Sequence, residues 1–326
     1  MRAVVLVGGE GTRLRPLTWT TPKQMLPVGG RPMIERVLGS LAAHGIDEAV
    51  LSLGYKPDAF IDAYPDGRCV GVALRYAVED EPLDTAGAIR FAALECRLAE
   101  TFVVVNGDVI TDLDVTGLVR FHRQSGAEAT IALTPVEDPS PFGVVPTDES
   151  GRVVAFIEKP AAGEAPTNLI NAGTYVLEPS VLDRIPGGRR ASIERETFPS
   201  LVEHGRLYAL ASSAAWIDAG TPATYLEANL RYAADPDRSC RRSDGAVVQD
   251  SVVGSGVVFG PGSVVESSVL MDGVVVGQGS KVRGSIVGHG ATIGAGSRVE
   301  SLSVIGPGFE VAAGVHLTSE RAPAVT

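Results

Sequence analysis

The sequence predicts an α/β protein with a mostly parallel sheet, followed by a parallel β-helix. Apolar strand-like runs alternate with helical patterns over the first two thirds of the chain, and a six-residue repeat rich in glycine fills the last quarter. Strands that alternate with helices form parallel sheets covered on both faces. Helical packing cannot explain a period of six, whereas short strands that turn corners at fixed intervals can.

The strands and helices of the first part can be assigned in order. Asp84 and Asp114 are candidate helix N-caps, Pro32 stands near a helix start, and Gly45 and Gly126 are candidate helix ends. The predicted strands are "AVVLV" (3–7), "EAVLSL" (48–53), "VALRYAV" (72–78) and "TFVVV" (101–105), and the predicted helices lie within 31–45, 84–95 and 114–126. Ligands of such sheets bind beyond the carboxyl ends of the strands. We therefore expect residues 8–15, 79–85 and 106–108 around one crevice.

The pattern changes after "YLEANLRYAADPDRS", a last helix that we expect to end at Asp235-Pro236. From Val253 the chain reads in sixes, and an aliphatic or aromatic residue that opens each unit is often followed by glycine. Three units make one triangular coil, so eleven units predict somewhat under four coils of a left-handed parallel β-helix. The predicted domains are residues 1–234, a linker at 235–250 and the β-helix at 251–326.

Composition narrows the classes of function. The 326 residues include 28 basic and 39 acidic side chains, a formal net charge of −11, which repels phosphate backbones and anionic lipid. We therefore expect neither nucleic acid nor membrane partners. Cys69, Cys96 and Cys240 fit neither a disulfide framework nor zinc-ligand spacing, and no apolar run suits a signal peptide or a membrane span. These features favour a soluble cytoplasmic protein.

The segment "VGGEGTRLRPLTWTTPKQMLPV" (7–28) places three glycines, two arginines and a lysine after the first strand. Such a loop exposes backbone N–H groups and lets a phosphate approach closely. A Walker loop needs lysine directly after the last glycine, but Gly11 is followed by Thr-Arg. Pro16 and Pro22 exclude the uninterrupted helix of a dinucleotide fold. The segment therefore predicts a polyphosphate-binding loop, with a solvated charged surface as the alternative.

Together with "PKQML", this segment resembles the signature of the sugar-1-phosphate nucleotidylyltransferases, GxGTRLxPLTxxxPKxMxPV. Further segments resemble, in the same order, the mannose-1-phosphate guanylyltransferase branch, which also carries a C-terminal hexapeptide β-helix. They are "EPLDTAGAI", "VVNGDVITD", "FGVV", "FIEKP", "NLINAGTYVLEPSVLDRI", "SIERETFPSLVEHGRLYAL" and "WIDAGTPATYLEANL". The resemblance implies a Rossmann-like nucleotidyltransferase domain that joins an NTP to a sugar 1-phosphate and releases pyrophosphate.

The resemblance also assigns roles to residues. It gives Arg13 to the β- and γ-phosphates and the leaving pyrophosphate, and Lys23 to the α-phosphate region. Asp108 and Asp218 match the aspartates with which the family holds Mg²⁺, an ion that takes few protein ligands and keeps its waters. The remaining assignments are nucleotide binding by Val7, Gly8, Gly9, Gly11, Thr12, Glu79, Thr85, Asn106 and Gly107, and sugar-phosphate binding by Gly143, Glu158, Lys159 and Asn171.

Two of these assignments depend on local conformation. Glu158 and Lys159 are neighbours, and neighbours in a strand point to opposite faces, so one of them is expected to serve the site through the loop made by Pro160. Glu158 next to Lys159 is alternatively a surface ion pair. Asp84 stands where the family commonly has glycine, and its carboxylate places negative charge near the nucleotide.

Glu79 is the candidate for base selection. Alignment with the related thymidylyltransferases puts it where they carry a base-reading glutamine. A carboxylate accepts from both N1–H and the 2-amino group of guanine, whereas thymine and uracil offer one N3–H between two carbonyls. Glu79 therefore favours GTP, and a solvated glutamate in the acidic loop "EDEP" is the alternative.

Other functions stay open. Thymidylyl, uridylyl or adenylyl transfer to glucose 1-phosphate is the alternative within the class, because "PKQ" with Gln24 also occurs among thymidylyltransferases. A catalytically silent regulatory subunit is the alternative of another class, although the residues assigned to phosphate and metal are retained. His289 and His316 lie in the β-helix, where some relatives use a histidine for acyl transfer. The coils here are few and carry no long inserted loop, so we expect the β-helix to join subunits of a homo-oligomer.

Overall fold

The computed structural model describes residues 1–233 and 240–325, and its chain forms two compact units. The first unit contains Met1–Gly9 and Ile34–Trp216, and the second contains Glu10–Met33 and Ile217–Thr326. The cationic half of the glycine-rich loop therefore belongs to the same unit as the β-helix.

The predicted helix end at Asp235-Pro236 and the first part of the predicted linker lie outside the described residues. The division into domains at 234 and 251 stays a prediction.

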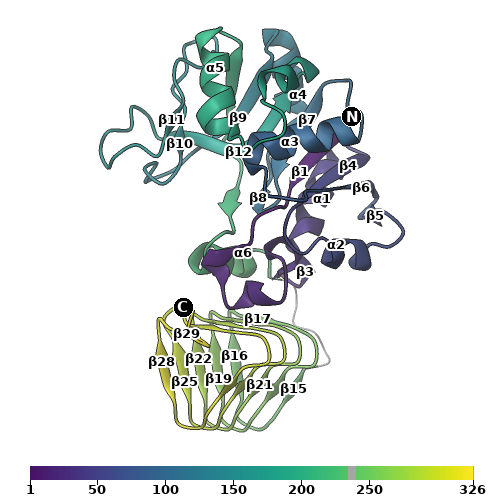
Figure 1. Ribbon diagram of the computed structural model, residues 1–326. Helices are drawn as coiled ribbons and strands as arrows, with labels where there is room; N and C mark the ends of the chain where they lie inside the picture. The colour runs from purple at the N-terminus through teal and green to yellow at the C-terminus, as the bar shows by residue number, and fades with distance from the viewer. Residues whose placement is uncertain (234–239, 326) are drawn as a thin grey trace. The chain divides into compact units, whose positions relative to one another are not determined.

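A ten-stranded sheet forms the centre of the first unit (Figure 1). Its middle strands β6, β4, β1 and β7 are parallel, and β12 joins β7 in the antiparallel direction. The strand order reverses between β1 and β7, which is where ligands of doubly wound sheets bind. The strands are β1 (Arg2–Leu6), β4 (Glu48–Leu53), β5 (Arg68–Cys69), β6 (Val72–Val78), β7 (Phe102–Asn106), β9 (Ala129–Pro135), β10 (Gly143–Val144), β11 (Ile157–Glu158), β12 (Leu169–Leu177) and β13 (Leu207–Ala211). The four predicted strands are confirmed, each to within one residue.

Helices cover this sheet. Helix α3 (Asp84–Glu95) packs on β1, β4 and β6, and α4 (Val115–Ser125) packs on β9, β12 and β13. The other helices are α1 (Met33–Ala43), α2 (Asp58–Ala63), α5 (Phe198–Glu203) and α6 (Pro222–Arg231), and the remaining short strands outside the β-helix are β2 (Pro27–Val28), β3 (Arg31–Pro32), β8 (Val109–Thr111) and β14 (Trp216–Asp218).

One helix start is as predicted and one is not. The Asp114 carboxylate accepts a hydrogen bond from the Gly117 N–H at 2.9 Å and caps α4. Asp84 does not cap α3, because the helix begins at Asp84 itself and the carboxylate accepts from the adjacent Thr85 N–H. The φ of Asp84 is +61°, a left-handed conformation that glycine adopts at least cost. That conformation accounts for the glycine that the family commonly has here.

The C-terminal half of the second unit is a parallel β-helix of three five-stranded sheets (Figure 1). Apolar openers such as Phe259, Val276 and Ile293 stack inside it. The first sheet holds β15 (Arg241–Arg242), β18 (Val258–Phe259), β21 (Val275–Val276), β24 (Thr292–Ile293) and β27 (Glu310–Val311). The second holds β16 (Val247–Gln249), β19 (Val264–Glu266), β22 (Lys281–Arg283), β25 (Arg298–Glu300) and β28 (His316–Thr318), and the third holds β17 (Val252–Val253), β20 (Val269–Leu270), β23 (Ile286–Val287), β26 (Val304–Ile305) and β29 (Arg321–Ala322).

The described strands thus make five levels rather than the predicted count of under four. Strands β15 and β16 lie within the segment predicted as linker, and they pair in parallel with β18 and β19. Arg242 stands where the later coils carry the apolar openers Phe259, Val276, Ile293 and Val311. Because the apolar opener is missing there, the six-residue period is not visible in the sequence before Val253.

Helix α6 ties the N-terminal segment of the second unit to the β-helix. It packs on β20 of the β-helix and on β2, which forms a hairpin with β3. The buried Tyr225 hydroxyl donates to the Pro27 carbonyl, and the Asn229 side-chain carbonyl accepts from the Gly29 N–H at 3.0 Å. These bonds hold the segment that follows the cationic loop.

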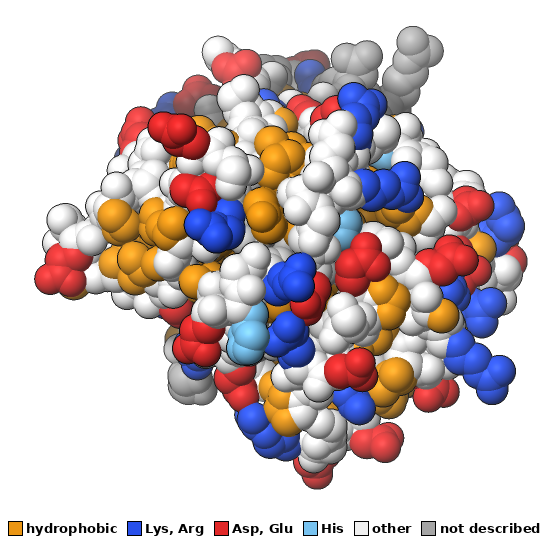
Figure 2. Space-filling model, turned by 90° about the horizontal axis from the view of Figure 1, so that it is seen from above, with side chains coloured by type: hydrophobic (Ala, Val, Ile, Leu, Met, Phe, Trp, Pro, Cys, Tyr) orange, Lys and Arg blue, Asp and Glu red, His pale blue; other side chains and the backbone are white. Residues whose placement is uncertain are grey.

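The acidic composition does not give a single-sign surface on the face shown in Figure 2. Acidic and basic side chains lie interspersed over that face, with small apolar areas between them. Across residues 1–233 and 240–325, no helix is long and apolar enough to cross a membrane.

We expect the stability of the first unit to fall as the pH drops below about 6.5, because of His122. Its side chain is buried, with Nδ1 2.8 Å from Thr130 Oγ1 and Nε2 3.0 Å from Glu178 Oε1. Burial lowers the pKa of His122, which outweighs the opposing effect of Glu178. The unfolded state therefore binds more protons, and stability rises with pH up to the unfolded pKa of 6.5. Urea unfolding at several pH values should show this slope in the wild type and a smaller slope in His122→Gln.

The matched control for this measurement is His204→Gln, since His204 is exposed. It should keep the wild-type slope. Equal slopes in wild type and His122→Gln would assign the acid sensitivity to other groups.

Candidate functional site

The first group of predicted site residues lies where the strand order reverses. Val7, Gly8 and Gly9 follow β1, and Gly107 follows β7 and donates its N–H to the Leu6 carbonyl at 2.9 Å. A Cβ on Gly8 would lie 3.5 Å from the Gly54 nitrogen and 3.6 Å from Glu79 Oε1. The structure therefore brings the start of the glycine-rich loop next to the predicted base-reading residue.

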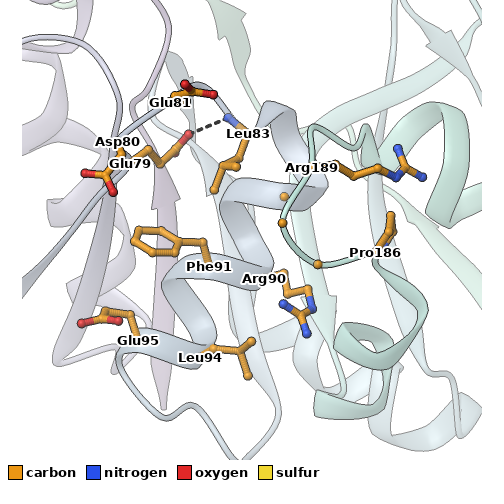
Figure 3. A pocket seen from close by; sticks show the side chains of 13 residues that line it. Glu79, Asp80, Glu81, Leu83, Arg90, Phe91, Leu94, Glu95, Pro186 and Arg189 are labelled. Atoms are coloured by element: carbon orange, nitrogen blue, oxygen red, sulfur yellow. Dashed lines mark hydrogen bonds between the residues drawn. The ribbon is translucent and has the colours of Figure 1, made fainter.

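Glu79 is held rigidly in this position. Its Oε1 accepts from the buried Ser52 hydroxyl at 2.9 Å, and its Oε2 accepts from the Leu83 N–H at 3.0 Å (Figure 3). A carboxylate offers about four acceptor sites, so each oxygen keeps capacity for a further donor. The side chain is thus not a mobile solvated glutamate, which was the alternative from the sequence.

Thr85 connects the start of α3 to the segment "SIERETF", in which no residue was assigned a role from the sequence. Its hydroxyl donates to Glu194 Oε2 at 2.7 Å and accepts from the Ile193 N–H at 2.9 Å. Glu194 also accepts from the Ser192 hydroxyl at 2.8 Å. These residues open the π-helix Ile193–Thr197, a form that is frequent at functional sites.

Gly143 and Glu158 face each other across the β10–β11 pair. A Cβ on Gly143 would lie 2.7 Å from Phe156 Cζ and 3.1 Å from Glu158 Oε2, so a larger residue does not fit beside them. Burial raises the pKa of Glu158, and the charge of Glu194 raises it further, whereas Lys159 and Arg195 lower it. Glu158 is therefore a partly buried carboxylate within the electrostatic reach of the π-helix.

Lys159 departs from the expectation that it and Glu158 point to opposite faces. Its φ is +51°, so the backbone leaves the extended conformation there, and its N–H donates to the Phe142 carbonyl at 3.0 Å. The Lys159 Nζ consequently lies 4.0 Å from Glu158 Oε1, with an exposed side chain. Strand alternation does not apply at a left-handed residue.

Asn171 sits at an irregularity in the pairing of β12 with β9. Its amide donates to the hydroxyl of Tyr175 at 2.9 Å, and its carbonyl accepts from the Gly173 N–H at 2.9 Å. A Cβ on Gly173 would lie 2.7 Å from Asn106 Nδ2, so glycine lets β12 pass close to the end of β7.

The pKa of the buried Tyr175 is affected by the charges that lie near this irregularity. Burial raises its pKa well above the usual range, with further increases from Glu194, Glu158 and Asp108. The structure of the first unit therefore gathers residues predicted for the metal and for the sugar phosphate around one place.

The second group of predicted site residues lies in the other unit. Gly11 has a left-handed φ of +63° and is followed by the 3₁₀ helix Thr12–Leu14. A left-handed residue beside a helical one turns successive N–H groups toward one point, which suits an anion. A Cβ on Gly11 would lie 3.0 Å from both Lys23 Cβ and Thr18 Cγ2, and the Thr18 hydroxyl donates to the Gly11 carbonyl at 2.9 Å. Gly11 thus allows the loop to pack tightly against the buried Lys23.

Arg13 and Asp218 meet at Gly220. A Cβ on Gly220 would lie 2.6 Å from an Arg13 guanidinium nitrogen and 2.7 Å from Asp218 Oδ1, and that oxygen accepts from the Gly220 N–H at 2.9 Å. Arg15, from the same loop, is directed elsewhere, since its guanidinium pairs with Glu10 at 2.7 Å. Arg13 and Lys23 are therefore the loop cations that contact predicted site residues.

The donor set is chemically suited to a divalent ion. Asp108 and Asp218 are half-buried carboxylates, and carboxylate oxygens are ligands that Mg²⁺ prefers. They belong to different units. Within the described chain, no three His, Cys, Asp or Glu side chains cluster closely enough to hold a metal by themselves. This fits an ion that takes a few protein oxygens together with phosphate and water.

A cavity of about 530 Å³ adjoins the loop that contains Glu79. It follows one side of α3 and is lined on the other side by the loop at 186–189 (Figure 3). Glu79 lies at one end of this cavity, and the side chains of Arg90 and Phe91 line it from α3. A Cβ on Gly187 would lie 3.0 Å from an Arg90 guanidinium nitrogen, so glycine allows the loop to pass close to this side chain.

Glu194 and Arg195 are not among the site residues predicted from the sequence. Both lie in "SIERETF", a segment that carries the resemblance, but nothing local marks them as site residues. Glu194 accepts a hydrogen bond from Thr85, and the charges of Glu194 and Arg195 both act on Glu158. The resemblance was the one signal that could have drawn attention to this segment.

A glycine-rich loop with two cations, an α/β sheet that brings predicted site residues to its switch point, and a C-terminal β-helix are together typical of a Rossmann-like nucleotidyltransferase. Residues 2–235 match the family described as "Nucleotidyl transferase", and residues 237–322 match the family described as "GMPPB C-terminal domain". The chain belongs to the nucleotidyl transferase family and is an enzyme of that kind.

Curated relatives cover most of the chain. The chain is 43% identical over 278 residues to "Mannose-1-phosphate guanylyltransferase" of Mycobacterium tuberculosis. The matched region covers 80% of this chain and 77% of that protein. It is 42% identical over 236 residues to "Mannose-1-phosphate guanyltransferase" of Emericella nidulans, which covers 71% of this chain and 64% of that protein. The chain thus spans less than two thirds of the fungal relative.

Solved structures give the same fold. The crystal structure of HddC from Yersinia pseudotuberculosis complexed with GMP-PN matches with a TM-score of 0.61 and 31% identity. The match covers 71% of this chain and 99% of that one. The predicted fold and the predicted family are confirmed.

Proposed function

We propose that the chain transfers a guanylyl group from GTP to mannose 1-phosphate, giving GDP-mannose and pyrophosphate. Family membership and the names of the relatives support this reaction. The observation that carries the choice of base is Glu79, a carboxylate fixed by Ser52 and Leu83 beside Gly8 with acceptor capacity left on both oxygens. Guanine offers two adjacent donors to such a group.

In the proposed reaction an oxygen of the sugar 1-phosphate attacks the α-phosphorus of the NTP. A new P–O bond forms, the bond from the α-phosphorus to the bridging oxygen breaks, and pyrophosphate leaves with the electron pair. Both reactants are polyanions, so charge neutralisation and alignment dominate, and no general base is needed. Arg13 neutralises the β- and γ-phosphates and the leaving group, and Lys23 neutralises the α-phosphate region.

Backbone and sugar contacts complete the proposal. The loop amides and the switch-point residues hold the nucleotide, and the β10–β11 pair holds the sugar phosphate, with Glu158 accepting from sugar hydroxyls and Lys159 binding the phosphate. The nucleotide set is Val7, Gly8, Gly9, Gly11, Thr12, Glu79, Thr85, Asn106 and Gly107, and the sugar-phosphate set is Gly143, Glu158, Lys159 and Asn171.

We assign Mg²⁺ to Asp108 and Asp218. The donors are hard carboxylate oxygens, and the ion, when bound, supplies positive charge to the phosphate oxygens. In this proposal the protein supplies the two carboxylates, and Arg13 and Lys23 supply the fixed positive charges.

We further propose a homo-oligomeric cytoplasmic enzyme, with a catalytic domain at 1–234 and a β-helix at 251–326. Burial raises the pKa of the Cys69 thiol to about 11 and also raises that of Cys96. Thiols of this kind are structural and unreactive.

The proposed reaction is tested by measuring pyrophosphate release for a grid of NTPs and sugar 1-phosphates, with and without Mg²⁺. We expect the highest rate with GTP and mannose 1-phosphate. Activity with dTTP and not with GTP would overturn the choice of base. If no combination of NTP and sugar 1-phosphate gives activity, the alternative function of a catalytically silent regulatory subunit is favoured.

Glu79→Gln should lower kcat/KM for GTP about 10- to 100-fold and leave pyrimidine nucleotides nearly unchanged, since one bidentate base contact is worth about 1–3 kcal/mol. The glutamine can donate its NH₂ to Ser52 and accept from Leu83, so the local bonds survive. It cannot accept from both donors of guanine. Glu81→Gln, a change in the exposed part of the same loop, serves as the control. Equal losses for all nucleotides would remove Glu79 from base reading.

A further inference from the structure

The glycines that follow β18, β21 and β24 form one corner column of the β-helix in which the next coil leaves no room for a side chain. A Cβ on Gly260 would lie 2.6 Å from the Gln278 nitrogen, and one on Gly294 would lie 2.5 Å from the Ala313 nitrogen. The backbone of the next coil forbids a side chain at these corners. Ala312, the last residue of this corner column, is exposed and carries a methyl group, so the corner itself accepts alanine where no coil follows.

At Gly306 the space for a side chain is limited by different neighbours. Gly306 occupies the second position of the repeat unit "IGPGFE", but its nearest neighbours are two proline rings. A Cβ there would lie 3.1 Å from both Cβ and Cγ of Pro16 and 3.2 Å from Cδ of Pro323. Pro16 and Gly306 are both buried. The phosphate-binding loop therefore rests on a corner of the β-helix.

Contacts within the loop connect this corner to the cations. The Pro16 carbonyl accepts from the Trp19 N–H at 3.2 Å and starts the 3₁₀ helix Leu17–Trp19, in which the Thr18 hydroxyl reaches back to the Gly11 carbonyl. Gly11 in turn packs on the Lys23 side chain. A displacement at Pro16 is thus passed to the backbone that carries Arg13 and Lys23.

We infer that Gly306, in the β-helix, is a positioning residue that fixes the cationic part of the glycine-rich loop through its contact with Pro16. This role is separate from the subunit contacts expected of the β-helix, and it rests on the proposed function of the loop. A methyl group at 3.1 Å is tighter than ordinary van der Waals contact, so the proline ring has to move by a few tenths of an ångström. The loop moves with it.

Gly306→Ala should raise the KM for the NTP and lower kcat/KM on the order of tenfold, since a 1 Å misplacement can cost about 10²-fold. The KM for the sugar 1-phosphate should stay unchanged, because the residues assigned to it belong to the first unit. A general loss of folding would instead lower kcat through the active fraction and leave both KM values unchanged. Ala312→Gly, a one-methyl change at the second position of the next repeat unit but in another corner column, should match the wild type.

Pro16→Ala provides a second variant that leaves the β-helix untouched. It removes Cγ from the contact, so it should shift the NTP KM in the same selective way and reduce the effect of Gly306→Ala in the double variant. The same variants are compared by the Kd of a non-hydrolysable NTP analogue, which does not require turnover. Wild-type activity with no NTP would defeat the proposed function. A folded Gly306→Ala variant with wild-type NTP KM and analogue Kd would overturn the inference alone.

Discussion

Arg13→Met should lower kcat/KM for the NTP by about 10²- to 10³-fold, the loss seen when one preorganised donor to a developing charge is removed, about 2.7–4 kcal/mol. The Arg13 guanidinium lies beside Gly220 and Asp218. Arg13 belongs to the short 3₁₀ helix that follows the left-handed Gly11. Methionine keeps an unbranched apolar stem and removes the charge that is proposed to neutralise the leaving pyrophosphate. Initial rates of pyrophosphate release over a range of NTP concentrations measure the effect.

Arg15→Met is the matched control, because Arg15 belongs to the same loop and pairs with Glu10. An exposed ion pair is worth about 0–1 kcal/mol, so this change should cost at most about fivefold. The proposed role of Arg13 fails if the two variants lose the same activity while thermal unfolding shows both to be folded.

The features that the sequence predicts well are those repeated along the chain. The strands at 48–53 and 72–78 are apolar runs between helical patterns, and the structure has both with the predicted bounds. The β-helix follows from a period of six that recurs many times. Each repeat applies the same physical constraint, so the pattern survives individual exceptions.

Features that depend on one backbone angle or on one long-range contact leave no such pattern. Asp84 and Lys159 have a positive φ, which makes the helix cap and the strand alternation expected for them inapplicable. Glu194 enters the site through the hydroxyl of Thr85, which is distant in sequence. The sequence gives no local sign of this bond.

The placement of the phosphate-binding loop is the largest difference. A loop that follows the first strand is expected to belong wholly to the sheet that it leaves. Here the chain changes unit after Gly9, and Pro16 packs on Gly306. The hydrophobic period predicts that each coil stacks on the next, but it does not tell which other segment covers a corner.

Asp108→Asn should lower kcat/KM by at least about 10²-fold and raise the Mg²⁺ concentration needed for half-maximal rate. Loss of a partner outside the ligand shell already costs about 10- to 100-fold in metal affinity, so loss of a ligand charge should cost no less. The amide keeps the shape of the side chain, which retains the fold of the turn after β7.

Asp112→Asn, an exposed aspartate a few residues along the same segment, separates the charge effect from a general change in the loop. It should keep the wild-type Mg²⁺ dependence. Binding of Mn²⁺, followed by electron paramagnetic resonance in the presence of a non-hydrolysable NTP analogue, gives a readout that does not require turnover. Because the carboxylates of Asp108 and Asp218 are proposed to act on one ion, Asp218→Asn should weaken Mn²⁺ binding similarly, and the double variant should lose little more than either single one. If Asp108→Asn binds Mn²⁺ as the wild type does, the metal does not bind at this aspartate.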